Sequence, residues 1–188
     1  MKRIIGDTVP LNGVSFIDDQ QTPLDWTATG YTPKIEIETQ DGTATLAATA
    51  ITAHPTQAVT LDSTNNWITC NDHGYQPGSQ VVFATSGSLS GTGLTAAQRY
   101  QVVEKDRNWF KVSLRTDGAA ITIAGAGTPT HTVYEVGSWQ ATNAQASLSS
   151  LTAQRYRAWV GAFNSTVQVE TAPAKNDGFI IEVLEKGN

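Results

Sequence analysis

Short stretches in which apolar and polar residues alternate recur along this chain, and they predict β-strands. In residues 34–39, Ile35 and Ile37 alternate with charged and polar side chains, so one face points inward and the other toward water. Asp41-Gly42 follows, and this pair supplies the positive φ angles of a tight hairpin turn. The other clear strand signals are residues 109–115, 166–170 and 179–184.

Weaker signals extend the same pattern over most of the chain, whereas helical periodicity is limited to residues 94–98 and 144–151. The weaker strands are expected at residues 14–17, 58–61, 67–70, 80–84, 100–104, 121–123, 131–136 and 155–163. Many short strands separated by turn signals are typical of sandwiches and barrels. The sequence therefore predicts an all-β protein.

The pattern changes near residue 56 and again near residue 138. The segment between these points is rich in glycine and holds two of the three histidines, whereas the flanks hold most of the prolines and the strongest Ile/Val alternation. We predict a discontinuous β-sandwich, residues 1–55 plus 137–188, interrupted by an inserted β-sandwich or barrel module at residues 56–136. Insertion at a loop is tolerated because closure entropy grows only with the logarithm of loop length.

The flanking segments resemble the immunoglobulin-like (Ig-like) domain of phage baseplate upper proteins. The resemblance lies in Gly-Asp-Thr-Val-Pro-Leu at 6–11, Leu-Asp-Trp at 24–26, the alternating strand 34–37, and the closing stretches 151–160 and 178–183. The turn after Leu24-Asp25 is longer here than in that family, and the insertion is a second departure. The resemblance implies an Ig-like sandwich.

The middle segment resembles a β module that recurs in tailed-phage tail and fibre proteins. Its signature, spread over about seventy residues, stands at 66–69 (Asn-Trp-Ile-Thr), 73–75 (His-Gly-Tyr), 78–83, 91–94, 100–103, 106–112 and 127–132. Together the two resemblances imply a virion structural protein of a tailed bacteriophage rather than an enzyme.

Composition narrows the possible partners. Only 15% of residues are charged and the net charge is −5, which argues against a basic nucleic-acid footprint and against an anionic membrane surface. The single cysteine, Cys70, excludes an internal disulfide and a Cys-rich zinc module. The chain carries neither an apolar run long enough for a membrane span nor a signal-peptide pattern at its start. We expect a soluble chain of intracellular origin that binds no nucleic acid and does not insert into membranes.

The reactive side chains give weak signals for chemistry. Cys70, Asp72 and His73 lie close together, and His131 could approach His73, but a zinc site needs three or four ligands and no further Cys or His pair has ligand spacing. A Cys-His-Asp triad would lack a recognisable nucleophile elbow, and a lone cysteine beside a strand is usually a small buried hydrophobe. We therefore expect both histidines to bond turn carbonyls.

Neither of the two acidic pairs is placed as a pair of catalytic carboxylates would be. Asp18-Asp19 fall in a turn, while Glu36 and Glu38 lie on the water-facing side of a strand, not in a cleft. We predict no catalytic residue, no metal site and no cofactor.

Tryptophans are the main indication of binding. Trp67, Trp109, Trp139 and Trp159 could form platforms for a sugar or anchor a subunit interface. Trp109 is out of phase with Phe110, Val112 and Leu114, so it points outward if those three point inward; for it we favour interface contact over carbohydrate binding.

Two arginines are the remaining candidates. Arg155 and Arg157 share one face of a late strand. They could pair with Glu36 and Glu38 across strands or mark a polar contact with a neighbouring subunit, and the sequence leaves both interpretations open.

These observations lead to one functional expectation and two alternatives. The leading one is a non-enzymatic tail or baseplate protein that is assembled in the host cytoplasm and contacts other virion proteins and copies of itself. The alternatives are a module that binds a host-surface glycan, and a head-decoration or head-fibre protein.

Overall fold

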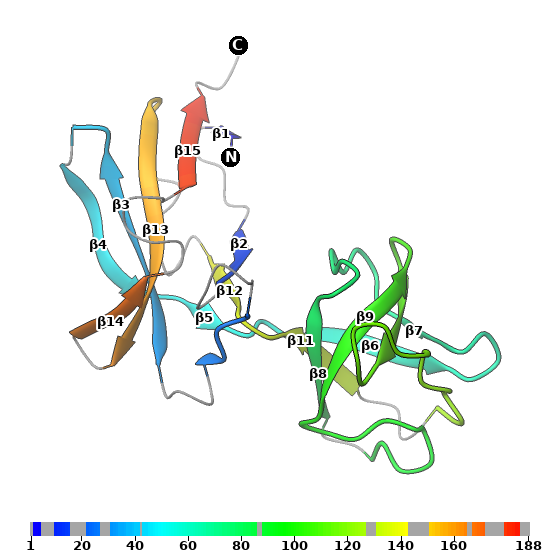
Figure 1. The fold of residues 1–188 in the computed structure, drawn as a ribbon. Coiled ribbons are helices and arrows are strands. Elements are labelled where there is room, and N and C mark those ends of the chain that lie inside the picture. The colour runs from blue at the N-terminus through cyan, green and yellow to red at the C-terminus, as the bar shows by residue number, and fades with distance from the viewer. Residues whose placement is uncertain are drawn as a thin grey trace. The chain divides into compact units, whose positions relative to one another are not determined.

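A computed structural model describes residues 2–4, 10–15, 22–26, 31–41, 43–85, 88–126, 131–142, 151–164, 167–171 and 179–184. Strands and turns dominate these residues, which confirms the prediction of an all-β protein with several sheets (Figure 1). The expected helix at 94–98 is instead irregular, with a turn at 96–97, and residues 121–123 form no strand. The other expected helix, 144–151, falls almost entirely outside the described residues.

The chain divides into two compact units. One comprises residues 1–54 together with 137–188, and the other comprises residues 55–136. The sequence pattern places these divisions at 55/56 and 136/137. Each unit has its own hydrophobic core.

The discontinuous unit contains a six-stranded sheet. Its strands are β1 (Lys2–Ile4), β3 (Thr32–Thr39), β4 (Ala44–Ala50), β13 (Arg155–Asn164), β14 (Val167–Thr171) and β15 (Phe179–Leu184). The order is β1-β15-β13-β3-β4, and β14 also pairs with β13. Only the β1–β15 pair is parallel. The long strand β13 occupies the middle because its residues 156–163 pair with β3 while β15 and β14 share its other side.

A second, smaller sheet completes this unit. It consists of β2 (Leu11–Val14), β12 (Ser138–Ala141) and β5 (Thr52–Ala53), in the order β2-β12-β5. The chain re-enters the unit at Gly137, which has φ +80°, and a Cβ at this position would lie 2.6 Å from the carbonyl oxygen of Ser15. Only glycine fits both constraints. Apolar residues of both sheets join in one core: Leu11, Ile35, Ile37, Trp139, Tyr156, Ala158 and Val160 are among its members.

The continuous unit is a closed six-stranded barrel. Its strands are β6 (Gln57–Asp62), β7 (Trp67–Thr69), β8 (Gln80–Thr85), β9 (Arg99–Lys105), β10 (Trp109–Ser113) and β11 (His131–Glu135). They close in the order β10-β7-β6-β11-β8-β9, so every strand pairs on both sides. Alternating residues fill the interior, including Ile68, Val81, Phe83, Val102, Phe110, Val112 and Val133.

Candidate aromatic surface on the barrel

Trp67 and Trp109 form a stacked pair on the outer wall of the barrel. They begin β7 and β10, two adjacent antiparallel strands, and their ring centroids lie 4.9 Å apart with an interplanar angle of 17°. Phe110 and Val112 point into the core, so alternation turns Trp109 outward as the sequence predicts. Leu114 departs from this pattern, because β10 ends at Ser113 and the Leu114 side chain is 60% exposed.

Charged groups frame this pair. The Lys111 ammonium lies 5.9 Å from the centre of the Trp109 ring and donates to the Glu104 carboxylate at 2.8 Å. Hydrogen bonds from the Asn65 side chain and backbone, with smaller ones from Thr64 and the Trp67 side chain, lower the pKa of Asp62. The two tryptophan rings therefore lie beside the Asp62 and Glu104 carboxylates and the Lys111 ammonium.

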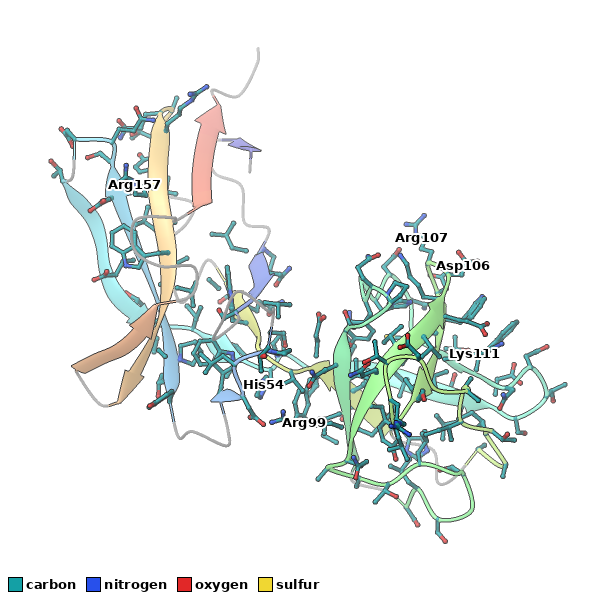
Figure 2. All side chains as sticks on the ribbon, in the orientation of Figure 1. His54, Arg99, Asp106, Arg107, Lys111 and Arg157 are labelled. Carbon is teal, nitrogen blue, oxygen red and sulfur yellow. The ribbon has the colours of Figure 1, made fainter. Side chains whose placement is uncertain are left out.

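A shallow hollow lies at the end of the barrel next to Trp109. It has a volume of about 550 Å³ and is lined by Asp72, His73, Gly74, Lys105, Asp106 and Arg107. Arg107 bonds Asp72 across it, and this bond raises the pKa of Arg107. Figure 2 shows Asp106 and Arg107 at the tip of the β9–β10 hairpin. Both partners of the ion pair are largely exposed, so the pair adds little stability.

Both histidines of the barrel bond backbone carbonyls, as expected from the sequence. His73 Nε2 lies 2.9 Å from the Asp106 oxygen and 3.1 Å from the Trp109 oxygen, while His73 Nδ1 accepts from the Tyr75 amide at 3.0 Å. Since Nδ1 accepts, Nε2 carries the proton and donates to the two carbonyls. His131 Nε2 lies 2.9 Å from the Ala126 oxygen. The His73 ring thus ties the 72–75 loop to the β9–β10 hairpin.

Cys70 is a buried structural residue. Its thiol donates to Gln57 Oε1 at 3.6 Å, and burial raises its pKa to about 11. A thiol with this pKa is almost wholly protonated at neutral pH and is a poor nucleophile. With His73 engaged by carbonyls and Asp72 bonded to Arg107, these three residues do not form a catalytic triad.

The candidates in the discontinuous unit lie apart from this surface. Trp139 and Trp159 are both buried, so neither presents an open ring as the platform hypothesis requires. Trp139 packs over Gly13, where a Cβ would lie 2.5 Å from the ring. Of the two arginines, Arg157 faces Glu38 across the β13–β3 pair, with Nη1 and Oε1 3.9 Å apart. Arg155 lies opposite Glu182 in the β13–β15 register.

Trp26 and Glu135 are important residues that our sequence analysis did not single out. Trp26 is buried, and its indole nitrogen donates to the carbonyls of Gly137 and Ser138, at 3.2 and 3.1 Å. Glu135 ends β11 on the same face as His131 and Val133, which point inward. Alternation within residues 131–136 could have placed Glu135 inward, whereas the sequence carries no signal for the partners of Trp26.

Glu135 makes the stability of the barrel depend on pH. Burial raises the pKa of its carboxyl, although the Ser79 hydroxyl, which donates to it at 2.5 Å, partly opposes this effect. A raised folded-state pKa contributes stability that is complete below the unfolded-state pKa and is lost as pH rises through the folded-state value.

We therefore expect Glu135→Gln to unfold at higher denaturant concentration than the parent chain at pH 8, with a difference that shrinks toward pH 4. Glutamine keeps an acceptor for Ser79 and carries no charge. Urea unfolding of both chains across this pH range measures the difference. A difference that does not vary with pH would contradict the assignment.

Comparison of the chain with protein-family models, with curated proteins and with solved structures yields no match. Within the described ranges, no helix is both long enough and apolar enough to cross a membrane. Among the same residues, no group of three or more His, Cys, Asp and Glu side chains is placed to hold a metal ion.

Proposed function

We propose that this chain is a non-enzymatic structural component of a tailed-bacteriophage virion, in the tail or baseplate region, that acts through protein–protein assembly. In this proposal the discontinuous unit is an Ig-like sandwich and the barrel is the module of tail and fibre proteins. Its partners are other virion proteins and copies of itself. The two sequence resemblances and the two-unit, all-β organisation support it.

The observation that carries the proposal is that residues of the barrel's signature make structural contacts within the barrel. Asn66 Oδ1 accepts from the Ile123 amide at 2.5 Å, His73 and His131 bond carbonyls, and Phe110 fills the core. These side chains belong to the segments that carry the resemblance, and their contacts stabilise the module. A signature made of architectural residues favours a displayed or assembled module over an enzyme.

The direct test is the protein content of particles from the phage that encodes this chain. Mass spectrometry of gradient-purified particles, washed in high salt, should detect the chain in a fixed ratio to the other virion proteins. Labelling with gold-conjugated antibody should place it on the tail and not on the head. Recovery of the chain only from the soluble fraction of the lysate would overturn the proposal, and labelling of the head would favour the decoration alternative.

The stacked tryptophans favour a second candidate function, binding of a host-surface glycan. One face of Trp67 rests on Trp109, and within the described residues no other ring lies over its second face. A sugar ring could stack there, beside Asp62, which lies opposite Trp67 in the β6–β7 register and offers a carboxylate to its hydroxyls. On a glycan array the parent chain should retain a defined set of sugars, and Trp67→Ala, which removes the ring with the open face, should lose them with an unchanged circular dichroism spectrum. Leu114→Ala, an exposed apolar change next to the end of β10, is the matched control; equal binding by Trp67→Ala would exclude the aromatic site.

A further inference from the structure

The six-stranded sheet ends at β4 with main-chain groups that β3 does not use. The Ile51 amide donates to the Pro33 oxygen at 3.0 Å, and Lys34 lies opposite Ala50. In an antiparallel ladder this arrangement makes Lys34 and Ala50 a non-hydrogen-bonded pair, so the N–H and C=O of Ala50 point away from β3. The Thr39 amide donates to the Thr43 oxygen, and the same reasoning applies to Ala44 at the other end of the strand.

Within the described part of the chain, this edge has few of the features that prevent strands from pairing. Residues 44–50 read Ala-Thr-Leu-Ala-Ala-Thr-Ala, with neither a charge nor a proline. Natural edge strands are usually guarded by lysines, prolines, bulges or covering loops. Of these devices, β4 has bulges, seen as two shifts of its register against β3. Among the described strands, only β3 pairs with β4.

We infer that the open edge of β4 binds the β4 edge of a second copy of this chain, in antiparallel orientation. An antiparallel two-fold contact sets the two copies of the strand side by side, so several charges of one sign along it would bring like charges close together. The Ala/Thr/Leu strand has none, although the whole chain has a net charge of −5. Backbone hydrogen bonds then continue the sheet across the two-fold axis, as in other strand-addition complexes. This inference rests on the proposed assembly function and names the partner and the surface.

Two substitutions at Ala50 test the edge. Ala50→Pro removes an N–H that points away from β3 and leaves the β3–β4 ladder intact, which makes proline acceptable there. Ala50→Lys places a charged, hydrated side chain on an exposed edge residue, and lysine on an edge strand opposes pairing with another strand. Ala58→Lys is the matched control, because Ala58 is an exposed alanine on β6, a strand paired on both sides within the closed barrel.

The measurement is molar mass by light scattering over a wide range of concentration, with circular dichroism as the check on folding. We expect the molar mass of the parent chain and of Ala58→Lys to rise with concentration from 20.1 kDa toward twice that value. Both Ala50 variants should weaken the dimer at least tenfold. Ala50→Lys keeps the test valid if the proline variant fails to fold.

Three results would overturn the inference: a parent chain that stays monomeric, Ala50 variants that dimerise like the parent, or Ala58→Lys weakening the dimer as much as they do. None of them decides the proposed function, which is tested separately by the protein content of purified particles. A larger oligomer that is insensitive to both Ala50 changes would reject the β4 contact while leaving assembly itself in place.

Discussion

Replacing Phe110 with alanine is expected to destabilise the barrel by about 3–5 kcal/mol, the usual cost of removing a buried phenylalanine. The side chain is 0% exposed. Its ring centroid lies 5.2 Å from that of His73 and 5.3 Å from that of Tyr75, both in edge-on contact. The substitution therefore leaves a cavity and removes two aromatic contacts at the point where β10 meets the 72–75 loop.

The single cysteine provides the measurement for this prediction. Cys70 is buried in the barrel core and its thiol has a raised pKa, so it should react with a thiol reagent only when the barrel opens. The labelling rate as a function of denaturant then reports the free energy of opening. Leu114→Ala removes an exposed side chain from the end of the same strand and should change this free energy by no more than about 0.5 kcal/mol. Equal labelling of the Phe110 variant and the parent would contradict the prediction.

Trp26→Ala should cost the discontinuous unit a similar amount, about 3–5 kcal/mol. The Trp26 side chain is 1% exposed and belongs to the core shared by the two sheets. Its indole N–H also bonds the two carbonyls at which the chain returns from the barrel, those of Gly137 and Ser138. The residue thus joins an early loop to β12, more than a hundred residues later in the chain.

Trp26→Phe separates the two contributions of this side chain. It retains most of the apolar ring and removes the donor, so we expect a smaller loss of about 1–3 kcal/mol, the usual cost of unsatisfied buried polar groups. Hydrogen exchange of the amides in β2 and β12, followed by mass spectrometry, measures both variants. If Trp26→Phe exchanged as fast as Trp26→Ala, the hydrogen bonds rather than packing would carry the whole effect.

The alternation of apolar and polar residues correctly predicted side-chain direction in strands that bury one face. Ile35 and Ile37 are both buried within β3. Phe110 and Val112 are buried within β10, and Trp109, at the start of that strand, points outward. The pattern misled at Leu114, because the strand ends at Ser113, which is itself buried. Alternation describes a strand but does not say where pairing stops.

Pairing between distant segments lay beyond local pattern. β11 pairs with both β6 and β8, and β13 lies between β3 and β15, although long stretches of chain separate these strands. The stack of Trp67 on Trp109 depends on the β7–β10 pairing, and the donors and acceptors around His73 depend on the hairpin that reaches it. None of these contacts has a short-range signature.

The sequence by itself determined the strand-rich character of this protein, the changes of pattern near residues 56 and 138, and the inward direction of alternating apolar residues in β3 and β10. It could do so because alternation and turn residues act over a few positions along the chain. The tertiary structure alone decided which tryptophans are buried, which histidine atoms are engaged and which of the described strands end the six-stranded sheet. Those properties arise when segments far apart in the chain meet, and the sequence of either segment does not specify its partner.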